Sequence, residues 1–474
     1  MRYLRAFSKY AIGTGLVLVV GLLTTPILTR LISTEDMGKY SMFMTLGNLI
    51  STLLCLGLDQ SYLRFYNDEK PESRNYLLRI CLLLPMGIFL ICGLFLLLFY
   101  KPFSMYIMGE VSFSLVLLFN AYMLGLMVDR FWTLKIQMAQ KEIAYSVLNF
   151  IRKIAYLLLA LLFIKLSFYE ESWDLMLAIT LAEVFVLLFA RIIEFGNWKC
   201  VSKKIKTSHG RLLHYGIPFA FASTITLIFH STDKMMLKAL SDYHNIGIYS
   251  GAQSIVNLLS QAQAVFVAFW IPVVYEHYSK DNEDTKFYIL MNKIVSYVML
   301  MILIGLICFK DLVVLFLGAD YREATYVFPF LAFMPVMTTI SETTVMGINF
   351  KKKTGYHIYI SVISMVVNAI GNYFLIKAFG AIGAAISTGL SYSVFFALRT
   401  YFSNKVFPVK YALKRYIMSA VLVYGLAIYA SFGSANLRFF LCAAGIVAFI
   451  TVLYRDIIIE CYKRIKEYLR HKFI

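Results

Sequence analysis

The chain has 474 residues, of which 60% are hydrophobic and 15% are charged, with a mean hydropathy of +0.72. A soluble domain has about 45–50% apolar and about 25% charged residues, so this composition excludes an ordinary soluble protein. The net charge of +18 would suit a nucleic-acid-binding protein, but the positive-inside rule of membrane proteins explains it better. We therefore expect no nucleic-acid partner. The apolar stretches are continuous rather than alternating, which indicates membrane-spanning helices and excludes a β-barrel.

Fourteen apolar stretches are each long enough for a spanning helix, which needs about 20 apolar residues. No gap between them holds a soluble domain, because the longest inner gap, near Gly196–Arg211, has about sixteen residues. The last two stretches have the least support, and twelve spans is the alternative if they do not cross the membrane. In chain order the predicted spans are 8–30, 40–60, 77–100, 111–132, 146–166, 174–195, 212–238, 247–272, 288–309, 324–348, 357–377, 382–402, 414–432 and 437–456.

The basic residues predict which side of the membrane each loop occupies. An even number of spans places both termini on one side, and 35 of the 45 Lys and Arg residues fall on that side. Lys and Arg concentrate in cytoplasmic loops, so we expect a multi-pass protein of the cytoplasmic (inner) membrane with both termini in the cytoplasm. The tail from Arg455 alternates apolar and basic residues. It is typical of an amphipathic helix on the anionic inner leaflet, so membrane lipids are an expected partner.

One polar pattern occurs twice in the chain. It reads Gly-x-Tyr-Ser, six residues, then Asn-Leu-(Ile or Leu)-Ser, and it begins at Gly38 and again 209 positions later at Gly247. This offset carries span 1 onto span 7 and span 2 onto span 8, so both halves enter the membrane in the same direction. Parallel repeats with a binding site between them are typical of transporters. We predict six-helix lobes at 1–206 and 207–403, followed at 404–474 by two additional helices and a basic tail.

Several short motifs carry a resemblance to a known family. They are Tyr10-Ala-Ile-Gly13, Pro26-x-x-Thr29-Arg30-Leu31-Ile32-Ser33, Gly57-Leu58-Asp59, Tyr62-Leu-Arg64-Phe65 and Asp233-Lys234 followed by Ile246-Gly247-x-Tyr249-Ser250. Together they resemble the polysaccharide-exporting branch of the multidrug/oligosaccharidyl-lipid/polysaccharide exporter superfamily. That branch includes O-antigen and capsule repeat-unit flippases.

The resemblance implies an all-α, V-shaped bundle of two lobes around a hydrophilic cavity. It also implies transfer of an undecaprenyl-diphosphate-linked oligosaccharide to the outer leaflet by alternating access, for O-antigen, capsule or exopolysaccharide synthesis. Polysaccharide polymerase and chain-length machinery would be further partners. A lipid II flippase or a multidrug exporter of the same superfamily is the alternative. Multidrug exporters favour cationic drugs and an acidic cavity, whereas intramembrane Arg and Lys are here at least as common as Asp and Glu.

A membrane polysaccharide polymerase or an O-acyltransferase is the alternative from the class of enzymes. Polymerases of this kind usually have a large outer loop, and no outer loop here exceeds about fifteen residues. The sequence has no G-x-S-x-G, H-E-x-x-H or P-loop pattern, and its seven cysteines form no C-x-x-C pair. We therefore predict a transporter rather than an enzyme. We expect no metal or cofactor, only coupling to a proton or sodium gradient.

Ionised side chains inside the predicted spans are the candidate site residues, because each costs about 2.5–3.5 kcal/mol at mid-membrane. The substrate implied by the resemblance carries a diphosphate, and a guanidinium can bind phosphate oxygens through two hydrogen bonds. The candidates for binding substrate or lining the lumen are Arg30, Asp59, Arg64, Asp129, Arg130, Arg152, Lys153, Asp233 and Lys234.

Two glutamates are the candidates for ion coupling. Glu183 and Glu342 lie within predicted spans, and neither has a cation one turn away in its own helix. The alternative for both is a hydrogen-bonded core carboxyl. Asp129 and Arg130 are adjacent, so their side chains point in different directions and do not neutralise each other within the helix. For the basic candidates near the ends of spans, anchoring at the membrane surface is the alternative; these are Arg30, Arg64, Arg152 and Lys153.

Overall fold

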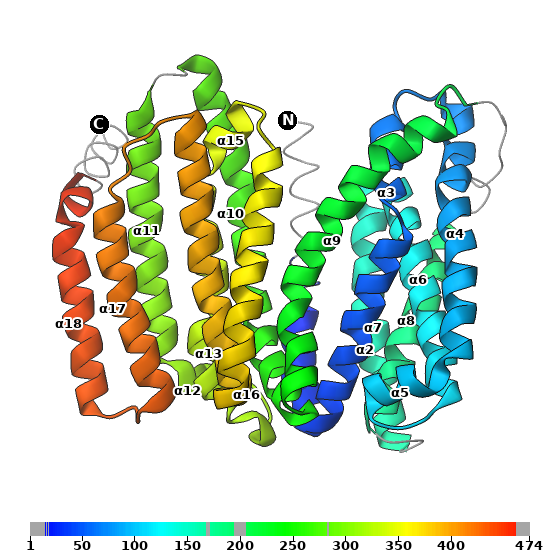
Figure 1. Cartoon of the computed structure of the whole chain (residues 1–474), viewed down its shortest axis with the longest axis horizontal. Coiled ribbons are helices and arrows are strands. Elements are labelled where there is room, and N and C mark those ends of the chain that lie inside the picture. The colour runs from blue at the N-terminus through cyan, green and yellow to red at the C-terminus, as the bar shows by residue number, and fades with distance from the viewer. Residues whose placement is uncertain are drawn as a thin grey trace, which may run out of the picture. The chain divides into compact units, whose positions relative to one another are not determined.

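The computed structural model of the chain describes residues 15, 17, 19–166, 171–193, 205–281 and 284–460, and this part of the chain is helical without a strand (Figure 1). Contacts divide the chain into two compact units. The first contains residues 1–238 and 242–247, and the second contains 239–241 and 248–474. This division by contact does not test the lobe boundaries at 206/207 and 403/404, which stay a prediction from the repeat.

The helices of each unit follow one another with short connections. The first unit contains α2 (Thr34–Leu54), α3 (Leu58–Phe65), η1 (Pro71–Ser73), α4 (Arg74–Leu98), α5 (Tyr100–Met108), α6 (Phe113–Met138), α7 (Glu142–Leu166), α8 (Glu171–Ile193) and nearly all of α9 (His209–Leu240). Helix α10 (Tyr243–Lys280) begins in the first unit and continues in the second. The second unit continues with α11 (Thr285–Cys308), α12 (Lys310–Val314), η2 (Ala319–Tyr321), α13 (Ala324–Leu331), α14 (Phe333–Glu342), α15 (Met346–Phe350), α16 (Gly355–Val406), α17 (Leu413–Phe432) and α18 (Leu437–Leu453).

The helices confirm a multi-pass membrane protein. Among the described residues, ten helices are long and apolar enough to cross a membrane, or eleven if the bent pair α2 and α3 forms one span. Helix α16 is two helices joined at Gly380, and these two parts coincide with the predicted spans 357–377 and 382–402. Shorter apolar helices, Val19–Thr29 and Leu437–Leu453, lie within the first and last predicted spans. The count of fourteen stays a prediction.

Two predicted spans are broken in the structure. The span predicted at 40–60 bends by 54° between α2 and α3, where Leu56 and Gly57 have positive φ angles of 47° and 68°. A Cβ atom on Gly57 would lie 2.0 Å from the carbonyl oxygen of Gly216, so this bend requires glycine. The span predicted at 324–348 is divided into α13, α14 and α15. Pro335 cannot donate to the carbonyl four residues earlier, and α13 ends at that residue.

One helix, or one broken helix, lies at the centre of each unit. Helix α6 packs against α2, α4 and α8, and its Phe119, Tyr122 and Phe131 are fully buried. In the second unit α13 and α14 take this position and pack against α16, α11 and α17. On the periphery, α4 exposes large apolar side chains such as Leu83 and Ile91, which in a membrane face lipid.

The first turns of α2 and α10 pack closely against each other within the first unit. A Cβ atom on Gly38 would lie 2.0 Å from the backbone oxygen of Tyr243, and one on Gly247 would lie 1.8 Å from the backbone oxygen of Thr34. The two glycines are the first residues of the repeated pattern, and Thr34 and Tyr243 are related by the same offset of 209. In each copy of the repeat the glycine therefore packs against the first residue of the other copy's helix. We call these four residues the glycine crossing.

A buried carboxylate joins two loops on the side predicted to be cytoplasmic. Glu69 accepts hydrogen bonds from the backbone amides of Lys206 and Thr207, at 2.9 Å each to Oε1. Desolvation opposes ionisation of this carboxyl, but the two amides outweigh it and lower the pKa of Glu69 below its usual value. The carboxylate therefore connects the segment before η1 to the segment before α9.

Glu69→Gln should destabilise the protein by about 1–3 kcal/mol at neutral pH, because a charged acceptor is lost opposite two backbone donors, of which the Thr207 amide is buried. Since folding lowers the pKa of Glu69, its contribution is present above the unfolded-state pKa of about 4.3 and is lost as the pH falls through the lower folded value. The difference in Tm between wild type and variant should therefore shrink in acid. Glu72→Gln, at an exposed neighbour, should leave Tm unchanged. An equal difference at every pH would contradict this account.

Candidate functional site: a polar cavity in the first unit

The first unit contains a cavity of about 740 Å³ between α2, α6, α7 and α9. Twelve of the sixteen residues that line it have polar side chains, although all four helices are otherwise apolar. The polar residues that line it are Asn48, Ser51, Thr52, Asp129, Arg130, Thr133, Gln137, Tyr145, Asn149, Arg152, Ser223 and Thr226. Because a polar wall inside a bundle of spanning helices is costly unless it holds water or a polar ligand, this cavity is the candidate site.

Adjacent residues of α6 take part in two separate ion pairs, as the angle between neighbouring side chains on a helix requires. On one side, Arg130 Nε lies 3.2 Å from Asp59 Oδ2 of α3, and Arg130 Nη1 donates to Thr52 Oγ1 of α2 at 2.9 Å. The Asp59 side chain is buried, whereas that of Arg130 is 35% exposed. The guanidinium therefore reaches the cavity with one edge and is held by α2 and α3 with the other.

On the other side, one guanidinium serves two carboxylates. Arg152 of α7 places Nη2 2.5 Å from Asp129 Oδ1 and Nε 3.3 Å from Glu183 Oε1 of α8. Arg152 also donates through Nη1 to Asn149 Oδ1 at 2.9 Å. Glu183 approaches because Gly125 of α6 has no side chain, since a Cβ there would lie 3.1 Å from Glu183 Cβ. We call Asp129, Arg152 and Glu183 the carboxylate–arginine triad.

The charges of the two groups do not cancel. Three carboxylates, those of Asp59, Asp129 and Glu183, face two guanidiniums, those of Arg130 and Arg152. Each guanidinium in the cavity thus already has a carboxylate partner, so an anion can bind only by sharing or displacing that partner.

The other predicted binding residues lie elsewhere. Arg30 and Lys153 are exposed and do not line the cavity. Arg64 is exposed and lies 3.2 Å from Asp68, one turn along the chain. On α9, Asp233 is buried. Its neighbour Lys234 donates to Ser41 Oγ of α2 at 2.7 Å.

Glu342 has a partner that its own helix does not supply. It lies 2.8 Å from Arg399 Nη1 across α14 and α16, and Arg399 also donates to Ser341 Oγ at 2.5 Å. The absence of a cation one turn away on the same helix therefore did not mean the absence of a partner, and the same is true of Glu183.

Sequence reasoning overlooked three residues at these sites: Thr52, Asn149 and Arg399. A polar stripe was visible on α2, where Asn48, Ser51 and Thr52 share one face at spacings of three and four residues. Arg399 was counted only as a basic residue near the inner end of a span.

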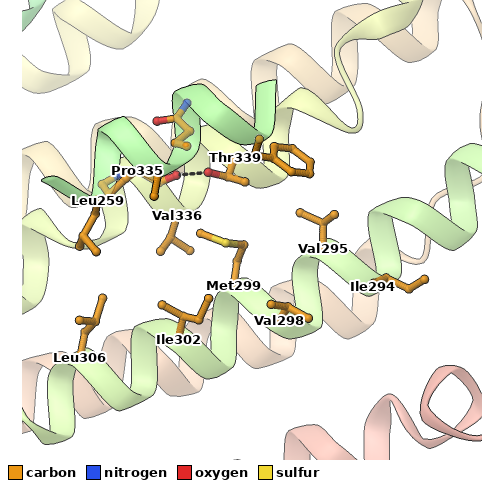
Figure 2. Close-up of a pocket in the computed structure, with 13 residues that line it drawn as sticks. Leu259, Ile294, Val295, Val298, Met299, Ile302, Leu306, Pro335, Val336 and Thr339 are labelled. Atoms are coloured by element: carbon orange, nitrogen blue, oxygen red, sulfur yellow. Dashed lines mark hydrogen bonds between the residues drawn. The ribbon is translucent and has the colours of Figure 1, made fainter. Parts of the chain in front are cut away.

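A second cavity, in the second unit, has a different character. It measures about 330 Å³ and lies between α10, α11 and α14. Figure 2 shows its apolar lining, with Val295, Met299 and Ile302 of α11 facing Val336 of α14. Apart from Gln263 and Thr339 its lining residues are apolar, and none of them is charged to compensate an ionised group.

The helical arrangement is similar to that of solved lipid and multidrug transporters. A lipid II flippase, MurJ, in its inward closed conformation matches with a TM-score of 0.69 at 16% identity, over 95% of this chain and 99% of that protein. An inward-facing multidrug resistance transporter of the MATE family in the MOP superfamily matches with a TM-score of 0.53 at 14% identity, over 84% and 97%. At these identities the likeness defines the fold.

The chain itself belongs to the polysaccharide biosynthesis protein family, which it matches over residues 4–277. This range contains every residue of the polar cavity. A probable low-salt glycan biosynthesis flippase, Agl15 of Haloferax volcanii, is 26% identical over 216 residues. That alignment covers 44% of this chain and 45% of Agl15, so it spans less than half the length of this relative.

Proposed function

We propose that this protein is a flippase that moves undecaprenyl-diphosphate-linked oligosaccharide repeat units across the cytoplasmic membrane by alternating access. The polar cavity supports this proposal most directly, because it offers two guanidiniums among spanning helices of a polysaccharide biosynthesis protein. Both termini would lie in the cytoplasm, and the glycan would be an O-antigen, a capsule or an exopolysaccharide. The polymerase and chain-length machinery that use the exported unit are the proposed partners, and the protein itself would not be an enzyme.

The proposed role of Arg130 is to bind the diphosphate. Its guanidinium is the more exposed of the two. It stays anchored through Thr52 and Asp59 while its free edge faces the cavity. Hydroxyl and amide side chains along α2 and α9, such as Asn48 and Thr226, are suited to hydrogen bonds with sugar hydroxyls. A planar fork of donors matches phosphate oxygens better than the ammonium of a lysine does.

Arg130→Gln should reduce flipping by at least about tenfold, which corresponds to one lost charge-assisted interaction of about 1.5–3 kcal/mol. The measurement is the fraction of a polyprenyl-diphosphate oligosaccharide in proteoliposomes that becomes accessible to a glycosidase added outside. Arg64→Gln removes an equal charge from an exposed pair and should flip normally. If the Arg130→Gln variant flipped the substrate at the wild-type rate, Arg130 would not belong to the binding site.

Cells lacking the gene test the function itself. They should accumulate undecaprenyl-linked repeat units on the cytoplasmic leaflet, and re-expression should clear them. A changed polymer length with undiminished export of single units would instead favour the membrane polymerase.

A multidrug exporter is the second candidate, and it is favoured by the three carboxylates that face two guanidiniums in the ion pairs in and behind the cavity wall. An acidic site attracts cations, and a cationic dye would then be expelled from cells that express the protein. If the protein exported the dye and did not flip the lipid-linked glycan, the multidrug exporter would be favoured over both the repeat-unit flippase and a lipid II flippase.

A further inference from the structure

The carboxylate–arginine triad has a geometry that the proposed binding of a diphosphate does not by itself require. Arg152 lines the polar cavity, whereas Glu183 does not and lies behind it. The Glu183 side chain is only 5% exposed, and its second oxygen, Oε2, is buried without a hydrogen-bond partner. A buried carboxylate oxygen without a donor is costly while the group is charged.

Arg152 supplies the cation that holds Glu183 in its charged form. The other titratable groups around Glu183 are Asp129 and Tyr122 of α6 and Tyr40 of α2. None of these three carries a positive charge, and Asp129 competes with Glu183 for the same guanidinium. If Arg152 turns toward an anion in the cavity, Glu183 is left buried and charged with no cation beside it.

We propose that Glu183 binds a proton when the diphosphate takes Arg152, so that this triad links substrate binding to protonation. The inference rests on the proposed function and adds a coupling site to it. In the empty site Arg152 is shared by Asp129 and the Glu183 carboxylate. In the loaded site the guanidinium binds phosphate oxygens, and one proton from water forms an O–H bond at Glu183 Oε2. When the diphosphate leaves, Arg152 returns to Glu183 and the proton returns to water.

A proton fits this role better than a metal cation. A metal ion near Oε2 would need several oxygen ligands, and among the described residues no group of three or more His, Cys, Asp or Glu side chains is placed to hold one. A proton instead removes the negative charge and leaves no charge to compensate. By linkage, protonation of Glu183 must then strengthen diphosphate binding by the same factor by which the diphosphate strengthens protonation.

The test measures affinity against pH with the purified full chain. The probe is a short-chain polyprenyl-diphosphate disaccharide, whose diphosphate diester does not titrate near neutrality. Affinity should rise by up to about tenfold for each unit that the pH falls across the range where one proton is linked. Calorimetry in buffers of different ionisation enthalpy should show uptake of one proton for each ligand bound.

In the Glu183→Gln variant the side chain is neutral at every pH. This variant should therefore bind the disaccharide probe tightly at every pH, without proton uptake. Arg152→Lys keeps the charge but not the fork of donors, so it should bind weakly while folding. Glu276→Gln, which removes a carboxylate from an exposed pair with Lys280, should retain the wild-type pH dependence.

The failures can be told apart. If the disaccharide probe does not bind at any pH, both the proposed function and this inference are wrong. If it binds with the same affinity at every pH, or if Glu183→Gln keeps the pH dependence, the coupling at Glu183 is wrong while the flippase proposal stands.

Discussion

Arg152→Met should destabilise the first unit by about 3–5 kcal/mol, because it removes the cation that two buried carboxylates share. Asp129 and Glu183 lie 2.5 Å and 3.3 Å from this guanidinium, and both side chains are largely buried. Methionine occupies similar volume, so the lost charge, rather than an empty cavity, causes the effect. The measurement is thermal unfolding of the purified protein in detergent, and a lower Tm is the expected result.

A second variant separates charge from shape. Arg152→Met combined with Glu183→Gln removes one of the two unpaired carboxylates and should recover part of the stability, while flipping stays lost. Arg64→Met, which breaks an exposed pair, should change stability by less than about 1 kcal/mol. If the single variant at Arg152 were as stable as that control, the triad would not be an electrostatic unit of the fold.

The sequence allowed the ionised residues in and beside the polar cavity to be singled out, but not their partners, and their role in binding stays a prediction. Each of the charged residues now seen together, Asp59, Asp129, Arg130, Arg152 and Glu183, stood out because ionised groups are rare in apolar spans. Which carboxylate meets which guanidinium depends on the rotation and depth of α3, α6, α7 and α8, and helical spacing within one segment carries no information about either. Pairs of residues one helical turn apart can be predicted from the sequence, whereas contacts between helices cannot.

The fold could be predicted from the sequence where the two copies of the repeat share recognisable residues. Beyond the polar pattern, the same offset of 209 relates Lys101 to Lys310 and Gly109 to Gly318. Lys101 and Lys310 lie in α5 and α12, Gly109 follows directly after α5, and Gly318 follows four residues after the end of α12. Both helices were missed because nine and five residues are too few for an apolar stretch that crosses a membrane. The break at Gly57 was missed for a different reason: the need for glycine arises from Gly216, far away in the sequence.

The helix starts of the two repeats match in detail. Ser33 Oγ accepts from the amide of Asp36 at 3.1 Å, and Asp242 Oδ1 accepts from the amide of Asn245 at 2.8 Å. Serine and aspartate both serve as N-caps, so the repeat preserves the cap while the residue changes. The glycine crossing follows within the next two turns of both helices. The close packing of α2 and α10 is thus built from equivalent positions of two copies.

Gly247→Ala and Gly38→Ala should each force the glycine crossing apart. The added Cβ atoms would lie 1.8 Å and 2.0 Å from backbone oxygens. A backbone atom cannot rotate away as a side chain can, so the helices themselves must shift. Thr34 Oγ1 lies 2.7 Å from His244 Nδ1, so cysteines at Thr34 and His244, in a cysteine-free background, report the shift by disulfide formation. The bond should form readily with both glycines present and poorly with either alanine. Gly87→Ala, where a Cβ meets nothing within 4 Å, should not change it.

The same cysteine pair tests whether the crossing must open during transport. Alternating access, as proposed, moves the two repeats against each other, and the crossing joins the first turns of one helix from each. Oxidation should therefore stop flipping in proteoliposomes, and reduction should restore it. The alanine variants should flip slowly in either redox state, because they weaken the state in which the helices touch. Undiminished flipping by the cross-linked protein would mean that this contact is a permanent part of the first unit, and the moving parts would have to be sought beyond α2 and the first turns of α10.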